Sequence, residues 1–326
     1  MTTLAAKLAF AVAAAASLGG PATGQEGPPP QPGSEGVVLD YLQDRGDRMT
    51  VPVSIDGRGP YRFVVDTGAE RTVIARELAR DLSLGAGLSA RVHSMSEVSD
   101  IATAVIPELK VAGKTMRGIE APLLSRYHLG AEGMLGVDSL KFQRVSFDFD
   151  KQEMTIAPSK RREERWAPGA IVVSGRSHYG HLVLVDASIE GQKVWVIVDT
   201  GSEVTVGNSA LRRKLEGKGR LGPVRPINVM SVTGGQIVAD QTLVRRIRLG
   251  GMEISDMPIA FADVHPFKKL KLTDRPAILL GMDALQLFER VSVDFANRRV
   301  RMLARPHSGL RAPSLLAQAD ARRLGS

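Results

Sequence analysis

The sequence carries one pattern twice, and this internal duplication constrains the fold more than any other feature. In each copy an apolar segment runs into Asp-Thr-Gly, as Phe63-Val-Val-Asp-Thr-Gly68 and again as Val196-Ile-Val-Asp-Thr-Gly201. Each copy later contains a second motif, Met134-Leu-Gly-Val-Asp138 or Leu279-Leu-Gly-Met-Asp283. Equivalent positions lie 133 residues apart at the first motif and 145 apart at the second. This period is too long for a solenoid repeat and indicates two whole domains.

Both copies have the pattern of short β-strands separated by glycine turns. The segments Met49–Gly57 and Leu182–Gly191 alternate apolar and polar residues, and each precedes the strand that leads into Asp-Thr-Gly. Only 5% of the residues are aromatic, and Val-rich runs favour strands. We therefore expect an all-β fold of two tandem domains. A helix or a turn is expected at Ala75–Leu82 and at Asn208–Leu215, and one short helix after each Leu-Gly motif.

The N-terminus has the composition of a secretory signal peptide. Lys7 precedes the apolar run Leu8–Leu18, and small residues follow at Ala22-Thr-Gly24. This predicts a secreted or periplasmic protein, and an uncleaved segment is the only expected route to a membrane. A Pro- and Gly-rich linker follows the signal peptide. The expected parts are a signal peptide (1–24), a linker (25–36), a first domain (37–165), a second domain (166–305) and a flexible tail (306–326).

Composition excludes several classes of site. The chain has no cysteine, so disulfides, thiol catalysis and cysteine metal sites are impossible. The net charge is +8, but the basic residues are scattered and no aromatic platforms accompany them, which disfavours nucleic-acid binding. The six histidines do not form a metal-binding pattern, and no G-x-S-x-G motif is present. We expect neither a metal nor a cofactor.

The two Asp-Thr-Gly motifs supply the carboxylates that metal-free peptide hydrolysis requires. Each Asp follows an apolar strand, where an ionised carboxylate is costly unless it has a partner or a task. Two carboxyl groups held close together share a proton, so that one acts as general base and the other as general acid. Asp66 and Asp199 are therefore the candidate catalytic pair.

The neighbouring residues suit such a pair. Gly68 and Gly201 allow close approach of two loops, and Thr67 and Thr200 can form hydrogen bonds across to the opposite loop. Ser202 occupies the position where the first copy has Ala69. We expect its hydroxyl to donate to Asp199, which would make Asp199 the more readily ionised partner. Asp138 and Asp283 are expected to be helix N-caps and not catalytic groups.

These motifs resemble the retropepsin-like aspartic proteases, which include bacterial aspartyl proteases, and more distantly the two lobes of pepsin. The resemblance covers nearly all of residues 37–158 and 170–304. It implies two β-barrel domains that form a pseudo-dimer with the dyad between them. It also implies a water nucleophile without metal and a mobile hairpin flap over a cleft. It assigns Gly136 and Gly281 to packing beside the catalytic loop. Flap candidates are Met95-Ser96, Met230-Ser231 and Gly234-Gly235, and the first flap departs from the pattern because it lacks glycine.

The sequence therefore predicts an aspartic endopeptidase that acts on protein or peptide substrates. The alternative is an inactive protein on the same fold that binds peptides or acts as a scaffold, for instance by adding an extended peptide to a sheet edge. Two arrangements of the active site also stay open. The dyad forms within one chain, as expected for a monomer, or each domain pairs with its copy in a second chain.

Overall fold

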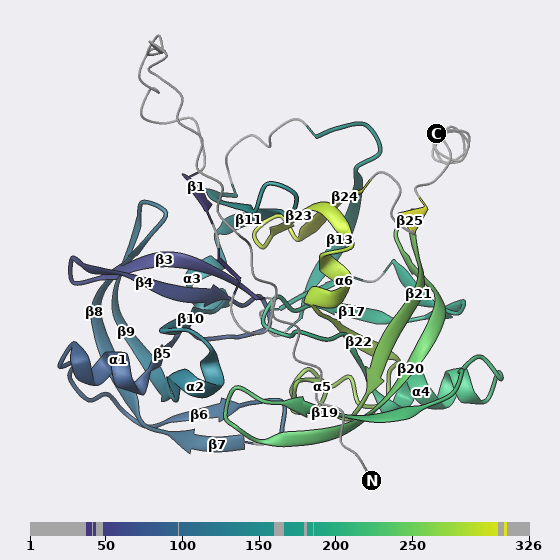
Figure 1. Ribbon diagram of the computed structural model, residues 1–326, viewed down its shortest axis with the longest axis horizontal. Coiled ribbons are helices and arrows are strands. Elements are labelled where there is room, and N and C mark those ends of the chain that lie inside the picture. Colours follow the sequence, from purple (N-terminus) through teal and green to yellow (C-terminus); the bar gives the residue numbers. More distant parts are fainter. Residues whose placement is uncertain are drawn as a thin grey trace, which may run out of the picture. The chain divides into compact units, whose positions relative to one another are not determined.

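The computed structural model describes residues 37–40, 42–43, 48–96, 98–159, 166–178, 181–184, 186–305 and 310–311 (Figure 1). The predicted signal peptide and linker lie outside these residues. The described residues belong to one compact unit, which is mostly strand, as predicted from the alternating pattern. No helix within these ranges is long and apolar enough to cross a membrane.

The first lobe, residues 48–140, is a closed barrel. Its strands are ordered β3-β4-β10-β5-β9-β8, and β8 pairs back to β3. The barrel strands are β3 (Met49–Ile55), β4 (Arg58–Val65), β5 (Val73–Ala75), β8 (Thr103–Val111), β9 (Lys114–Leu124) and β10 (Gly133–Leu135). Three helices, the hairpin β6–β7 and strand β2 complete it: α1 (Arg76–Asp81), α2 (Arg126–Leu129), α3 (Val137–Leu140), β6 (Ala90–His93), β7 (Val98–Ile101) and β2 (Leu42–Gln43).

The second lobe, residues 181–287, repeats this arrangement with one interrupted strand. The segment that corresponds to β3 is divided into β14 (His181–Leu184) and β15 (Ala187–Ile189), and the sheet runs between them in the order β14-β17-β22-β18-β21-β20-β15. The further strands are β16 (Gln192–Lys193), β17 (Trp195–Val198), β18 (Val206–Gly207), β19 (Arg225–Met230), β20 (Gln236–Leu249), β21 (Met252–Phe261), β22 (Ala277–Leu280) and β25 (Leu310–Arg311), which pairs with β21. The helices are α4 (Ser209–Glu216), α5 (His265–Lys269) and α6 (Met282–Leu285).

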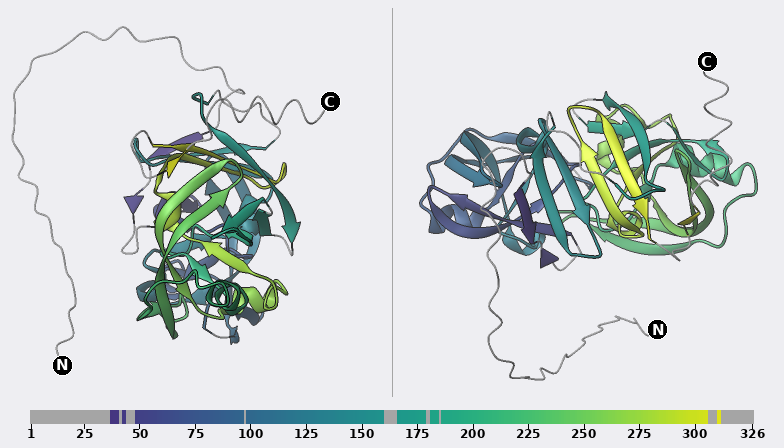
Figure 2. Two further views of the ribbon diagram at one scale, coloured as in Figure 1. Left: turned by 90° about the vertical axis from the view of Figure 1, so that its right-hand side faces the viewer. Right: turned by 90° about the horizontal axis from the view of Figure 1, so that it is seen from above.

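A shared antiparallel sheet joins the two lobes. Figure 2 (right) shows its teal and yellow strands between the blue first lobe and the green second lobe. Its central pair is β11 with β23, where Val145 lies opposite Val293 and the Ser146 hydroxyl donates to Ser292 Oγ at 2.8 Å. The strand order is β1 (Val37–Asp40), β12 (Glu153–Pro158), β11 (Gln143–Asp148), β23 (Phe288–Asp294), β24 (Arg299–Ala304) and β13 (Ile171–His178).

Parallel strand pairs in each lobe bring the two sequence motifs together. In the first lobe β4 lies parallel to β10, so that Val65 pairs with Leu135, and in the second β17 lies parallel to β22. The ladder continues one residue beyond the strands, because Asp66 N–H donates to Leu135 O and Asp199 N–H donates to Leu280 O, both at 3.0 Å. Each Asp-Thr-Gly therefore begins where the buried last three residues of a strand end, next to a Leu-Gly turn.

The predicted helices are confirmed, but the expected caps are not. Helices α1 and α4 lie within one residue of the predicted segments, and α3 and α6 follow the Leu-Gly motifs. Asn208 caps α4 by accepting the Leu211 N–H at 2.9 Å. The N-cap prediction for Asp138 and Asp283 was wrong, because Gly136 and Gly281 occupy those positions and the aspartates lie in the first helical turn.

Candidate active site

The two Asp-Thr-Gly loops face each other within the chain. The side chains of Asp66 and Asp199 come from different lobes, and each residue is only 7% exposed. Each carboxylate is held by its own loop: Asp66 Oδ1 accepts the N–H groups of Gly68 and Ala69 at 2.7 and 2.9 Å, and Asp199 Oδ1 accepts that of Gly201 at 3.0 Å. The loops thus aim both carboxyl groups into the same space.

Reciprocal hydrogen bonds between Thr67 and Thr200 lock the loops together. Thr67 Oγ1 donates to Val198 O at 2.7 Å and accepts the Thr200 N–H at 3.1 Å. Thr200 Oγ1 in turn donates to Val65 O at 2.6 Å and accepts the Thr67 N–H at 3.0 Å. All four bonds cross between lobes and are buried. Both threonine hydroxyls are therefore used twice, each once as donor and once as acceptor, and together they satisfy four backbone groups.

The glycines of both loops lie against the opposite carboxyl group. A Cβ on Gly68 would stand 2.5 Å from Asp199 Oδ1, and one on Gly201 would meet the Asp66 carboxylate in the same way. Behind the loops, a Cβ on Gly136 would stand 2.5 Å from the carbonyl carbon of Arg71, and one on Gly281 would stand 2.6 Å from that of Val204. The two carboxyl groups can thus lie close together only because glycine, which has no side chain, occupies these positions.

Replacing Gly68 by Ala should separate the carboxyl groups. We expect a loss of about 100-fold or more in peptide cleavage, because misplacement by about 1 Å has this effect, and destabilisation of about 1–3 kcal/mol from overpacking. Gly85→Ala is the matched control, since its Cβ would meet nothing within 4 Å. Assays of turnover and thermal unfolding on both variants test this, and equal behaviour of the two would contradict the close packing.

Asp138 and Asp283 brace the loops from behind. The Asp138 carboxylate accepts the N–H of Thr72 at 2.9 Å and its hydroxyl at 2.8 Å, and Asp283 accepts the corresponding groups of Thr205 at 2.9 and 2.7 Å. Thr72 and Thr205 lie at the ends of the two aspartate loops. Both carboxylates are thus committed to backbone support, as expected for residues outside the chemistry, although by contacts other than capping.

The two carboxyl groups differ in electrostatics. Burial raises the pKa of Asp66, but the Gly68 N–H, the Arg48 charge and the Ala69 N–H oppose this increase. Burial also raises the pKa of Asp199, and the negative charge of Asp66 raises it further, well above the usual range. These causes make Asp66 the more readily ionised member of the pair and favour retention of the shared proton on Asp199.

The hypothesis that Ser202 favours ionisation of Asp199 was wrong. The Ser202 hydroxyl donates to Val204 O at 2.8 Å and so is turned toward its own loop. The asymmetry has a different source, because the charge of buried Arg48 lowers the pKa of Asp66, whereas the negative charge of Asp66 raises that of Asp199.

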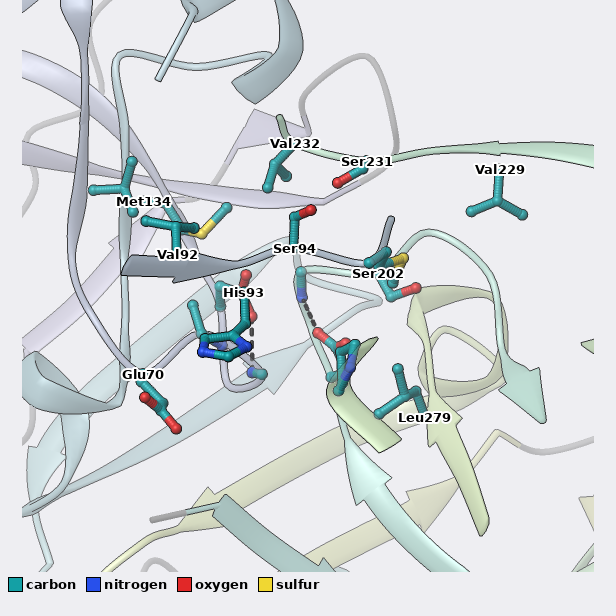
Figure 3. A pocket seen from close by; sticks show the side chains of 18 of the residues that line it. Glu70, Val92, His93, Ser94, Met134, Ser202, Val229, Ser231, Val232 and Leu279 are labelled. Atoms are coloured by element: carbon teal, nitrogen blue, oxygen red, sulfur yellow. Dashed lines mark hydrogen bonds between the residues drawn. The ribbon is translucent and has the colours of Figure 1, made fainter. Parts of the chain in front are cut away.

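The dyad opens into a cavity of about 380 Å³ between the lobes, within the size range of sites for small ligands and side chains. Figure 3 shows Val92, His93 and Ser94 of the first lobe near Ser231 and Val232 of the second. Among the predicted residues, Gly68, Gly201, Ser202, Met95, Met230 and Ser231 line this cavity together with the dyad. Thr67, Thr200, Gly136 and Gly281 support it without lining it, and Ser96, Gly234 and Gly235 lie at the hairpin tips.

Both predicted flaps are hairpins. The second consists of β19 and β20, and its tip is closed by bonds from Ser231 N–H to Gly235 O at 2.8 Å and from Gly234 N–H to Ser231 O at 2.9 Å. The first consists of β6 and β7, paired from Ala90 with Ile101 to His93 with Val98, and forms without a glycine. The two tips meet, because a Cβ on Gly235 would contact the Ser96 side chain.

Sequence reasoning missed a set of charged residues along the cavity. Arg48, Glu70, His181, Glu203 and Lys269 all line it. Glu70 Oε2 lies 2.6 Å from Lys269 Nζ, and Glu70 Oε1 lies 3.7 Å from His181 Nε2. The repeat contained a signal for four of them, since Arg48 and His181 are 133 residues apart, as are Glu70 and Glu203.

The comparison with protein families agrees with the two-lobed geometry. A family model described as aspartyl protease matches residues 51–139 and 185–284, one region in each lobe. The chain belongs to this aspartyl protease family. Each matched region contains one Asp-Thr-Gly and the Leu-Gly motif that packs behind it, so the resemblance to retropepsin-like proteases and the tandem arrangement are confirmed. No curated protein matches the chain.

Proposed function

We propose that the protein is an aspartic endopeptidase whose active site forms within one chain. The observation that carries this proposal is the pair of buried carboxyl groups, each held by its own loop and pressed against the glycine of the other. Membership of the aspartyl protease family supports protein or peptide substrates. The four threonine bonds between lobes support a site completed without a second chain.

The electrostatic asymmetry assigns the two roles. Asp66 starts as the carboxylate and takes a proton from the attacking water, which adds to the carbonyl carbon of the scissile bond. Asp199 starts protonated and gives its proton to the carbonyl oxygen. In the second step the protonated Asp66 gives its proton to the amide nitrogen, and the C–N bond breaks. Asp199 takes a proton back from a hydroxyl of the tetrahedral diol, so that a carboxylic acid and an amine are released and the dyad is restored. The low exposure of both residues strengthens these charge interactions.

The cavity walls suggest the form of the substrate. Val92, Leu124, Val232 and Leu279 supply apolar surface around the dyad, and two hairpins cover it. An extended peptide with apolar side chains beside the scissile bond suits this space. We further propose that cleavage takes place in the periplasm or outside the cell, where the predicted signal peptide would direct the chain.

Cleavage of a peptide library between pH 3 and 7 by purified residues 25–326 tests this function. We expect cuts beside apolar residues, detected by mass spectrometry, from protein that elutes as a monomer. A folded chain that binds library peptides without cutting them at any pH would overturn the proposal in favour of an inactive peptide-binding protein. Activity confined to a dimer would instead place the dyad between two chains.

A further inference from the structure

The two hairpins over the cavity are anchored differently. The tip of the second, β19–β20, lies over α2 of the first lobe, where a Cβ on Gly234 would contact the His128 ring. Among the described residues, no hydrogen bond joins this hairpin to α2. The first hairpin, β6–β7, instead makes a set of specific contacts with α5 of the second lobe.

Three kinds of contact hold the first hairpin on α5. The His265 N–H donates to Met95 O at 3.0 Å. The His93 and His265 rings meet edge to face, with centroids 5.3 Å apart and an interplanar angle of 71°. The Met95 side chain packs against a separate apolar cluster of the second lobe that includes Phe267 and Leu270. A backbone bond, a ring pair and an apolar anchor thus act at one short segment.

Helix α5 belongs to a connection that is longer in the second copy. Fifteen residues, 262–276, separate β21 from β22, whereas eight residues, 125–132, separate the corresponding β9 and β10. The longer connection accounts for part of the extra sequence between the motifs of the second copy. It also supplies Lys269, whose ammonium group binds Glu70 four residues after Asp66.

The bond to Glu70 connects the same helix to the dyad loop. The nearby His181 ring, followed by the hydrogen bond and charge of Lys269, lowers the pKa of Glu70 to about 2 against the opposing effect of burial. Glu70 therefore stays ionised at any pH where the dyad would work. Helix α5 contacts the first hairpin at one end and the dyad loop at the other.

We propose that α5 is a clasp that fixes the first hairpin as a wall of the cleft, so that only the second hairpin opens to admit substrate. This inference rests on the proposed function for its substrate, but not for the hairpin mobility it predicts. His265 is then a positioning residue, which acts through His93 and Met95 and touches no reacting group. The enzyme, although built from two similar lobes, would work with one lid.

The clasp also predicts a pH dependence. His93 faces His265 and Lys269 of α5, Glu70 of the dyad loop and Arg91 of its own strand, and burial followed by the Lys269 and His265 charges lowers its pKa. The Nδ1 atoms of His93 and His265 are buried without a hydrogen-bond partner in the described part of the chain. Docking thus favours neutral His93, so it is complete above the ordinary histidine pKa and weakens as the pH falls below it.

Hydrogen exchange of the substrate-free chain tests the clasp. At pH 7 we expect amides of the first hairpin to exchange at least about tenfold more slowly than those at the second hairpin tip. His265→Ala should remove this protection and leave the second hairpin unchanged. His265→Phe should keep the protection, because an aromatic ring still packs against His93. His93→Phe should reduce the loss of protection on acidification, because the titrating imidazole is absent. His128→Ala is the matched control on α2 and should leave the first hairpin unchanged.

Either of two results would overturn the clasp: equal exchange of both hairpins in the parent chain, or unchanged protection of the first hairpin in His265→Ala. Repeating the measurement in Asp199→Asn removes self-cleavage and makes the readout independent of activity. Absence of peptide cleavage with a protected first hairpin would contradict the proposed function and leave the clasp intact. Peptide cleavage by a chain whose first hairpin is not protected would contradict the clasp and leave the proposed function intact.

Discussion

Replacing Asp66 or Asp199 by Asn should lower kcat for peptide cleavage by about 10⁴-fold or more. Each asparagine keeps the shape of the side chain and removes one of the two protonation roles. Because both carboxyl groups are buried and held by backbone N–H groups, no exposed carboxylate can take over either role. Asp81→Asn on the exposed surface is the control and should retain parent activity. A fall in kcat of much less than about 10⁴-fold in both dyad variants would indicate a different catalytic group.

The same pair predicts an effect on stability with a defined sign. The pKa of Asp199 is raised in the folded chain by burial and by the charge of Asp66. A raised carboxyl pKa favours the folded state below the unfolded pKa, and this contribution is lost as the pH rises through the folded pKa. Asp199→Asn removes a carboxyl group that costs free energy in the folded chain above its unfolded pKa, because it must there either keep its proton or be buried as a charge. Its free energy of unfolding should exceed that of the parent at neutral pH, with the gap closing in acid.

Chemical denaturation of both proteins across this pH range checks the sign. Parallel pH profiles of the parent and Asp199→Asn would contradict the burial argument, because the variant lacks the group that titrates. A variant less stable than the parent at neutral pH would mean that the carboxylate is held by favourable contacts that outweigh its burial. Activity and stability together distinguish a working dyad from an aspartate that only supports the loop.

Replacing Thr67 by Val should have the second-largest effect, because it removes the oxygen that serves both lobes at once. The Val198 carbonyl would lose its donor and the Thr200 N–H its acceptor, both in a buried setting. Each unsatisfied buried group costs about 1–3 kcal/mol, so we expect destabilisation of about 3 kcal/mol. This corresponds to a fall in Tm of roughly 6–12 °C for a chain of this size. Peptide cleavage should also fall, since the loops lose their alignment.

Two further variants make this test specific. Thr67→Ser keeps the hydroxyl and should recover most of the stability. Thr242→Val is the matched control, since Thr242 is also buried and its Oγ1 has no hydrogen-bond partner among the described residues. Thermal unfolding of the three variants should therefore separate the hydroxyl from the change in shape. Equal losses in Thr67→Val and Thr242→Val would show that the bonds between lobes contribute nothing beyond packing.

The sequence predicted the parts of the fold that depend on local pattern and repetition. Alternating strands, the helices after Gly136 and Gly281, and the two matched loops could all be read from residues close to one another in the chain. The glycine and threonine contacts between loops also followed, because the chemistry of two adjacent carboxylates requires close approach and a rigid support. Here the local and the global requirements agree.

The failures concern choices among competing partners. The Ser202 hydroxyl was predicted to donate to Asp199, but it donates to Val204 O of its own loop. Asp138 was predicted to cap a helix, but its carboxylate accepts hydrogen bonds from the N–H and hydroxyl of Thr72, which is 66 residues away in the sequence and adjacent in the fold. The contact of Met95 with His265 joins segments whose nearness depends on the packing of both lobes. Periodicity reports which face of an element is buried, but it does not report which residue lies opposite.

Because both lobes belong to one polypeptide, the two ends of the cleft can differ chemically. In a symmetric pair of identical subunits every substitution appears on both sides of the axis, so the two ends of the groove stay identical. Here Arg48 and His181 occupy equivalent positions of the repeat, yet one side chain is a long guanidinium and the other a short imidazole ring. A peptide therefore meets different surroundings toward its N-terminus and toward its C-terminus. Because the two halves of one gene can acquire different substitutions, the cleft can distinguish the two directions in which a peptide could bind.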